Sequence, residues 1–353
     1  MATTAVRSPL VTVQRWALTG IFLILGVAAL RLGSTLLLPV AVAALFALLL
    51  AKPVRWLTAR RVPPGIAAGL VVLSVVACFV TAVYFLASPA AEWMARAPST
   101  LQTAQVKVRK LMRPIAQLQQ TARQVEQITS TTPSNQQAVK VAPAGLLSKL
   151  SGTTIGFLGG FFTVVFLTFF LLAQGDRFRE KVSEFVHRRH HSDVQDTLRD
   201  MQQQMSTYLF TATTINTCVG ILTYLILLAV GMPNPGLWAV MAGVLNFIPY
   251  IGAIVTLGLI GLAGIVSFET TSQPFMAMGG FFVVNLIESN IVTPMMMGRR
   301  LPLNPVAVFL GFLFWGWVWG VLGAVLAVPL TVMIKVIADR VPSMQTVGVL
   351  LDS

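Results

Sequence analysis

Eight apolar runs alternate with short polar stretches along the chain, and this pattern predicts a bundle of membrane-spanning helices. The runs cover about residues 16–30, 35–51, 65–88, 154–173, 207–230, 237–268, 274–294 and 305–337. A straight helix crosses the hydrocarbon core with ~20 residues, so most of the runs have roughly the length of one crossing. Only residues 31–34 separate the first two runs, which predicts a tight helical hairpin there.

The sixth and eighth runs, 237–268 and 305–337, are too long for one straight crossing and too short for two. Pro249 has no N–H and clashes with the preceding turn, so a helix kinks or ends beside it. Gly252 lets the chain leave helical geometry at little cost. The sixth run is therefore expected to be broken at Pro249, either as a single crossing or as a hairpin that returns to the side it entered from. We favour the hairpin, because it also places Arg299 and Arg300 on the cytoplasmic side. The eighth run is expected to turn in the same way, with hinge residues Gly320, Gly323 and Pro329.

Composition assigns the chain to the all-α integral membrane proteins. Hydrophobic residues make up 56% of it and charged residues 10%, whereas soluble domains carry about 25% charged residues. Cys78 and Cys218 lie inside apolar runs and are predicted to be buried thiols without a disulfide or metal role. The sequence has no His-Glu-x-x-His, Gly-x-Ser-x-Gly or Walker motif. We therefore predict that the chain is not an enzyme or an ATP-driven pump and that it has no cofactor.

The net charge of +13 comes largely from Lys and Arg in short loops beside the apolar runs. Such loops stay on the cytoplasmic side, and this distribution differs from the single basic patch of a nucleic-acid-binding protein. We therefore predict cytoplasmic N- and C-termini, an external region from about 90 to 150, and no nucleic-acid partner. The basic residues behind this orientation are Arg7, Arg15, Lys52, Arg55, Arg60, Arg61, Arg177, Arg179, Lys181, Arg188, Arg189, Lys335 and Arg340.

Three regions are predicted: transmembrane helices in 1–89, an external helical region with a linker in 90–150, and a transport region in 151–353. The external region has apolar residues at alternating spacings of three and four from Leu101 to Val125, which is a heptad seam. This helix either packs on its own protomer or the membrane surface, or forms a coiled-coil-like contact between protomers. In the transport region, residues 177–206 predict an amphipathic helix at the cytoplasmic face.

Polar residues at the Pro249 break form the candidate solute site. Asn246 and Tyr250 flank the proline, and their side chains either bind a polar solute or satisfy carbonyls that the break loosens. Broken helices at membrane depth are common binding sites in transporters. Substrate-binding roles are therefore predicted for Asn246, Pro249, Tyr250 and Gly252. Asn216 in the fifth run is interpreted as an interhelical hydrogen-bonding residue.

The seventh run contains a candidate site for a coupling ion, either H+ or Na+. Its residues are Asn285, Glu288 and Asn290. An ionised carboxylate in hydrocarbon is costly, so an intramembrane glutamate usually faces a cavity or a partner. Glu288 is therefore either a proton or cation site, or a structural carboxylate held by backbone groups or Arg300.

Five motifs in the C-terminal half carry a resemblance to a known family. They are Gly243–Gly252 (GVLNFIPYIG), Ile287–Pro294 (IESNIVTP), Met297–Gly298, Leu303–Pro305 (LNP) and Gly320–Leu330 (GVLGAVLAVPL). The chain resembles the autoinducer-2 exporter (AI-2E, PerM-like) family of bacterial permeases. The resemblance implies an inner-membrane transporter that is a homo-oligomer, with some relatives described as pentamers that use an elevator-like movement. Relatives are associated with export of the quorum-sensing signal autoinducer-2, and others with sodium–proton antiport.

The leading hypothesis is a secondary transporter that exports a small polar organic solute and is driven by a proton or sodium gradient. Its expected partners are the lipid bilayer, the solute and further copies of the chain. One alternative is a cation–proton antiporter with Glu288 as the ion ligand. A dedicated antiporter is expected to have more than one intramembrane carboxylate, which weighs against this alternative. The other alternative is a non-transporting membrane scaffold, which does not need two broken segments.

The orientation can be tested by thiol labelling in spheroplasts, using a chain without its two native cysteines. An impermeant reagent should label Ser134→Cys from outside and leave Ser192→Cys unlabelled, because the basic loops hold the second position in the cytoplasm. The reverse pattern would overturn the predicted topology. Labelling of both positions after the membrane is opened is the control for reactivity.

Overall fold

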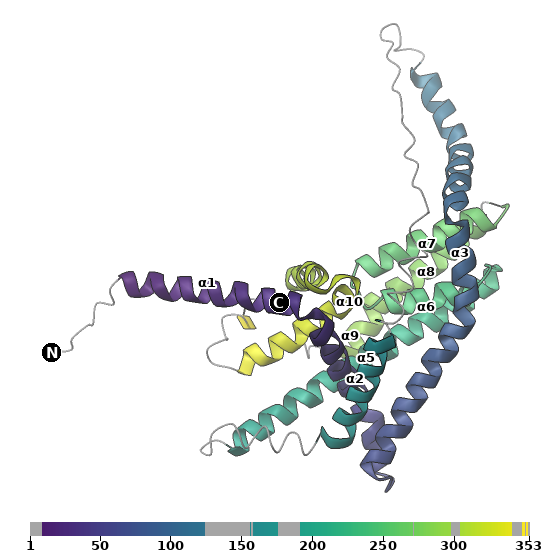
Figure 1. Cartoon of the computed structure of the whole chain (residues 1–353). Helices are drawn as coiled ribbons and strands as arrows, with labels where there is room; N and C mark the ends of the chain where they lie inside the picture. Colours follow the sequence, from purple (N-terminus) through teal and green to yellow (C-terminus); the bar gives the residue numbers. More distant parts are fainter. Residues whose placement is uncertain are drawn as a thin grey trace. The chain divides into compact units, whose positions relative to one another are not determined.

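The computed structural model describes residues 9–123, 156, 158–175, 191–270, 272–297, 304–340, 348–349 and 351, which are helical apart from short turns and connections (Figure 1). The predicted all-α fold is confirmed. The helices are α1 Pro9–Leu32, α2 Ser34–Thr58, α3 Pro64–Arg123, an unlabelled helix Leu158–Gly175, α5 His191–Val230, α6 Pro235–Leu245, α7 Ile251–Ser267, α8 Ser272–Ile287, the π-helix η1 Glu288–Val292, α9 Thr293–Met297 and α10 Pro305–Arg340.

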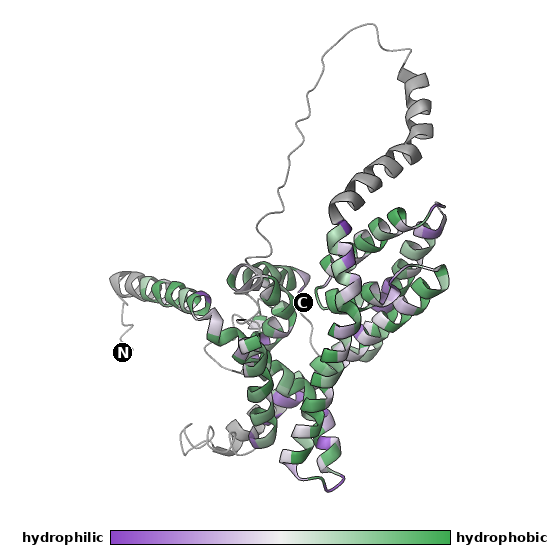
Figure 2. Ribbon diagram, turned by 45° about the vertical axis from the view of Figure 1, so that its right-hand side comes forward, coloured by the Kyte–Doolittle hydropathy of each residue, from purple (hydrophilic) through white to green (hydrophobic). Residues whose placement is uncertain are grey.

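Six stretches of the described residues are long and apolar enough to cross a membrane. Three more apolar helices are shorter: Ala17–Leu32, Pro235–Leu245 and Ile251–Ser267. Many large apolar residues are exposed, and hydrophobic residues, drawn green, make up most of the helices in Figure 2. A surface that faces lipid needs no polar cover, so this exposure and the spans together confirm a polytopic membrane bundle.

The predicted hairpin between the first two runs is wrong. Gly33 alone separates α1 from α2, and its φ of −81° and ψ of 10° lie close to helical values. Its N–H donates to the carbonyl of Ala29 at 2.8 Å, and its own carbonyl accepts from Leu37 N–H at 2.8 Å. One residue that keeps helical hydrogen bonds on both sides bends the chain but cannot reverse it.

The predicted external helix and the predicted cytoplasmic helix are each continuous with a neighbouring span and are not separate helices. The helix predicted to be external continues from the third span, since α3 is unbroken from Pro64 to Arg123 and runs through Pro114. Residues 191–206 of the predicted cytoplasmic helix 177–206 belong to α5, the helix of the fifth span. Residues 177–190, and the side chains of the heptad seam, lie outside what the structure describes.

The prediction of buried thiols is also wrong. Cys78 and Cys218 are both free and exposed. In a soluble protein an apolar neighbourhood along the chain usually indicates burial. In a membrane protein the same neighbourhood is equally typical of a lipid-facing surface, so it does not indicate burial.

The chain divides into two compact units, and α3 and α5 run from one to the other. The first unit comprises Met1–Ser74, Gly160–Thr211 and Arg299–Ser353. Its core contains Leu45, Leu209, Trp315, Ala327 and Leu330. The second unit comprises Val75–Gly159 and Ala212–Gly298. Its core is larger and includes Leu227, Trp238, Ile260, Ala277 and Phe281.

In the first unit, α10 folds back on itself at Gly320, which has a φ of 67° and a ψ of −146°. A Cβ built on Gly311 would lie 2.4 Å from Thr331 Oγ1, and one on Gly316 would lie 3.6 Å from Ala324 Cβ. Positions 311 and 331 would be ~30 Å apart in a straight helix, so the two halves run antiparallel. The sequence predicted this turn at Gly320.

Gly323 and Pro329, the other two predicted hinge residues of the eighth run, occupy different positions in the α10 hairpin. A Cβ on Gly323 would lie 2.0 Å from the carbonyl oxygen of Trp315, so glycine is needed there for close approach of the two halves. Pro329 lies within the second half of α10 and not at the turn. Hinge motion at any of the three residues remains a prediction.

In the second unit, the sixth run is divided into α6 and α7 by a turn of residues 246–250. The two helices pack on each other. With 11 and 17 residues, each is shorter than the ~20 residues of a straight crossing. The break predicted at Pro249 is therefore the turn of a helical hairpin.

Gly252 serves this hairpin for a different reason from the predicted one. It lies in the first turn of α7 and is not among the residues with positive φ. A Cβ at this position would lie 1.9 Å from the carbonyl oxygen of Leu245, the last residue of α6. Glycine is therefore needed for the close approach of the two helices and not for an unusual backbone angle.

Gly252→Ala should destabilise the hairpin by at least ~1–3 kcal/mol, because the new methyl group displaces a backbone carbonyl. The measurement is the apparent melting temperature in detergent. Gly258→Ala is the matched control, since a Cβ there meets nothing within 4 Å in the same helix. Equal melting temperatures for the two variants would contradict the close approach.

Candidate solute site

The backbone of the α6–α7 turn is strained at Tyr250. Its φ of 61° and ψ of −55° are unusual for a residue with a side chain. The N–H of Ile251 donates to the carbonyl of Pro249 at 2.6 Å, which closes a three-residue ring around Tyr250. This is the γ-turn of the rare form, and such a conformation costs ~1–3 kcal/mol. The side chain of Tyr250 is 69% exposed, so burial of its ring does not offset this cost.

A chain of three asparagine amides lies beside the turn. Asn246, at the end of α6, donates from Nδ2 to Asn216 Oδ1 on α5 at 2.9 Å. Asn285 on α8 donates from Nδ2 to Asn246 Oδ1 at 3.4 Å. Asn216 is buried, and the other two are half-buried. The structure thus confirms the interhelical hydrogen bond predicted for Asn216 and joins it to two of the predicted site residues.

Close packing of α5 on α6 brings the amides within reach of each other. A Cβ on Gly243 would lie 3.0 Å from the carbonyl oxygen of Asn216, and one on Gly220 would lie 3.2 Å from that of Ala239. The two helix backbones are therefore nearly in contact, as is common where small residues face each other in membrane helices. Asn216 lies one turn before Gly220, and Asn246 follows Gly243 at the end of α6.

The amide chain combines donors and acceptors in apolar surroundings. Each asparagine side chain has two N–H donors and one carbonyl acceptor. The two hydrogen bonds between these amides use one donor of Asn246 and one of Asn285. A neutral solute with hydroxyl or carbonyl groups matches the donors and acceptors that remain.

The predicted ion site lies on a π-helical turn, which the sequence analysis did not predict. Residues 288–292 form η1, and Thr293 N–H donates to the carbonyl of Glu288, five residues earlier. Pro294 has no N–H, so it cannot donate to Asn290, and an α-helical ladder cannot continue unchanged here. This proline is the signal in the sequence from which the turn was predictable. Single π-turns occur frequently at functional sites.

Polar side chains supply partners around the π-turn. Ser289 Oγ donates to the carbonyl of Asn285 at 2.8 Å, and Asn290 Nδ2 donates to that of Leu286 at 2.9 Å. The Thr293 hydroxyl donates to Glu288 Oε1 at 2.5 Å. Glu288 is half-buried, whereas Ser289 and Asn290 are exposed. No group of three or more His, Cys, Asp or Glu that could hold a metal ion occurs in the described part of the chain.

The two residue sets predicted from the sequence therefore meet at one point. Asn246 of the solute set and Asn285 of the ion set bond directly to each other. Asn290 instead bonds within its own helix. Thr293, the partner of Glu288, was missed because a threonine in an apolar run has no distinctive pattern.

Comparisons with known proteins agree on one family. The model of the family described as AI-2E family transporter matches residues 21–343. The AI-2 transport protein TqsA of Escherichia coli (strain K12) is 25% identical over 329 residues, which cover 93% of each chain. The putative transport protein YhhT of the same organism is 26% identical over 331 residues, covering 93% of this chain and 91% of its own. A putative transport protein of Borreliella burgdorferi is 29% identical over 209 residues, covering 58% of this chain and 57% of its own.

The Asn216–Asn246 bond can be measured by a double-mutant cycle on stability in detergent. Each single change to alanine should cost about 1–2 kcal/mol, because it removes one partner of a buried hydrogen bond. The double variant should lose less than the sum, by roughly 0.5 kcal/mol or more. Asn246→Ala combined with Thr270→Ala, in the exposed α7–α8 connection, is the control and should be additive. An additive Asn216–Asn246 pair would refute the bond.

Proposed function

The chain belongs to the AI-2E transporter family, and we propose that it exports a small polar organic solute similar to autoinducer-2 through the bacterial inner membrane. Family membership and the spans make it a multi-pass bacterial membrane transporter, in a family made up of transport proteins. We further propose that transport is directed outward, that the solute is small and polar, that a proton or sodium gradient drives it, and that both termini are cytoplasmic. We also propose a homo-oligomer, which the resemblance to pentameric relatives supports.

The amide chain Asn216–Asn246–Asn285 carries the proposal. It lies beside the turn of a hairpin of two short apolar helices, and amides in such surroundings are costly unless they are paired. A polar solute that exchanges hydrogen bonds with them keeps them paired during binding. Neutral amides suit an uncharged solute, which favours an organic molecule over a metal cation as the transported species.

The strained turn at Tyr250 and the π-turn at Glu288 support a site that changes shape. Strained backbone and π-turns both concentrate at functional sites, since they persist only when the surroundings hold them. Asn246 lies four residues before the first, and Asn285 lies three residues before the second. A rearrangement of either turn would move one amide of the site.

Glu288 is the proposed coupling residue. Its carboxylate accepts a hydrogen bond from Thr293, and its carbonyl accepts the N–H of the same residue across the π-turn. Protonation removes the charge that strengthens the first bond. The proton or sodium gradient would thereby act on the helix that carries Asn285.

A cation–proton antiporter is the second candidate, and the intramembrane carboxylate of Glu288 favours it. The neutral amides weigh against it, because a cation in this environment needs charged or multiple oxygen ligands. A scaffold without transport is a poorer candidate, since it needs neither hairpin. Flux of autoinducer-2 and of sodium into liposomes under imposed gradients separates the three functions.

Asn285→Ala should reduce flux of autoinducer-2 in liposomes at least about tenfold, since it removes one polar partner of a bound solute. Glu288→Gln should retain solute binding and lose the dependence of flux on the gradient, because glutamine keeps the shape but cannot ionise. Thr217→Val and Glu269→Gln are the matched controls, with exposed side chains at other positions of the same unit. Unchanged flux in Asn285→Ala would remove the amide from the site, and retained gradient dependence in Glu288→Gln would leave that carboxylate a structural role.

A further inference from the structure

The open end of the α10 hairpin is tied by the C-terminal residues of the chain. The two halves of α10 run antiparallel, so Asn304, just before the first half, and Asp339, near the end of the second, lie toward the same end. Gly348, Val349 and Leu351 lie against this end, and we call them the C-terminal strap. Asn304 N–H donates to the carbonyl of Leu351 at 3.2 Å, which joins the strap to the first half.

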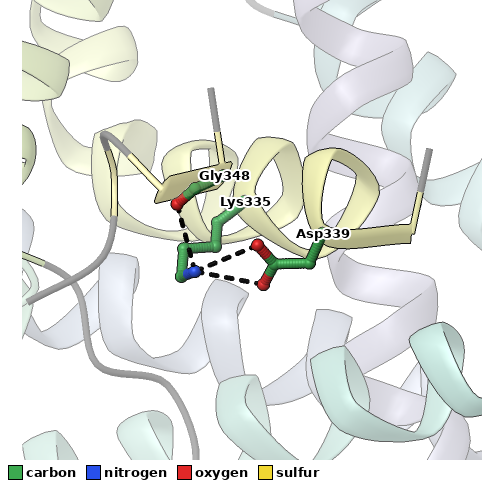
Figure 3. A network of polar contacts seen from close by, with 3 residues as sticks. All are labelled: Lys335, Asp339 and Gly348. Carbon is green, nitrogen blue, oxygen red and sulfur yellow. Dashed lines mark hydrogen bonds and ion pairs between the residues drawn. The ribbon is translucent and has the colours of Figure 1, made fainter. Parts of the chain in front are cut away.

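A buried ammonium group joins the strap to the second half (Figure 3). Lys335 Nζ donates to both carboxylate oxygens of Asp339 at 3.1 Å and to the carbonyl of Gly348 at 3.3 Å. The Lys335 side chain is only 6% exposed, so its charge depends on these acceptors. A Cβ on Gly348 would lie 2.5 Å from Asp339 Oδ1, so the strap lies directly on the helix.

The two ends of the α10 hairpin that the strap joins differ in burial. Val332, Val336 and Ala338 in the second half are at most 5% exposed, and the first two pack with Met205 of α5. At the start of the first half, Val306, Phe309 and Leu310 are each more than half exposed. Ala307 in the same stretch is buried, so the strap connects a partly exposed helix start to a buried helix end.

We propose that the C-terminal strap locks the open end of the α10 hairpin through the buried Lys335 ammonium group, and that its release frees the start of the first half to move away from the second. The lock does not depend on which solute is transported. The first half has core contacts farther along, at Trp315 and Val318, so movement is expected at its start, where the strap is attached. Asn304 adds to the lock because its Oδ1 accepts from Val306 N–H and orders the same helix start.

Hydrogen exchange of the full chain in detergent tests the lock. Gly348→Ala displaces the Asp339 carboxylate, because the new Cβ would lie 2.5 Å from its Oδ1, and Lys335→Met removes the ammonium group while keeping a long side chain. Both should speed exchange in residues 305–312 about tenfold or more, since charged hydrogen bonds hold that end. Residues 330–338 and the α7 segment 251–267 should exchange as in the wild type. Val349→Ala is the control, because that side chain is 74% exposed on the same strap.

Exchange in residues 305–312 that matches the Val349→Ala control would overturn the proposal. Equal acceleration in residues 251–267 would also overturn it, because the loss would then be global. A second measurement does not use Gly348→Ala or Lys335→Met, so it is independent of whether those variants fold. In a chain without the native cysteines, a short thiol cross-linker should join Asn304→Cys to Leu351→Cys. Failure to cross-link in this chain, with Lys335 and Gly348 intact, would show that the strap does not lie at the hairpin.

Discussion

Backbone groups that leave a helix inside a membrane must find new hydrogen-bond partners, and the α6–α7 turn satisfies this constraint. In the α6–α7 turn the N–H groups of Asn246, Phe247 and Ile248 bond back to carbonyls of α6, and Gly252 N–H bonds to Ile248. Pro249 has no N–H to satisfy, so it suits the turn as well as breaking the helix. Alanine at this position would add a donor without removing the other bonds, so it would not be sufficient to straighten the hairpin.

Glycine residues, which have no side chain, explain how polar groups come together in a largely apolar chain. Gly252 and Gly323 each leave room for a carbonyl of the preceding helix, which lets the chain reverse within a few residues. Gly243 brings α6 against α5, and the same contact places Asn246 beside Asn216. Without a hydrophobic driving force between helices in lipid, such close packing and interhelical hydrogen bonds supply much of the association energy. The packing of the hairpin and the assembly of the candidate site therefore have one cause.

The spans and both turns were predictable, because apolar length and the residues Pro249 and Gly320 act locally. The bend at Gly33 was not, since glycine at a helix junction is compatible with a hairpin or with a nearly continuous helix. The amide chain was not predictable either. Asn216, Asn246 and Asn285 lie on three helices, and only the packing of those helices determines which side chains meet. The exposed cysteines show the same limit, because an apolar run in a membrane protein does not distinguish core from lipid-facing surface.

The two bonds of the amide chain are unequal, and this bears on how a solute would enter it. The Asn246–Asn216 bond is 2.9 Å long and involves a buried partner, whereas the Asn285–Asn246 bond is 3.4 Å long between half-buried residues. A longer hydrogen bond is weaker, and a less buried one is easier to exchange. Under the proposed function, the bond to Asn216 therefore holds the hairpin turn against α5, while the bond to Asn285 is the one that a solute replaces. Asn285 lies directly before the π-turn of Glu288, so the exchangeable end of the site is also the end on which a coupling ion would act.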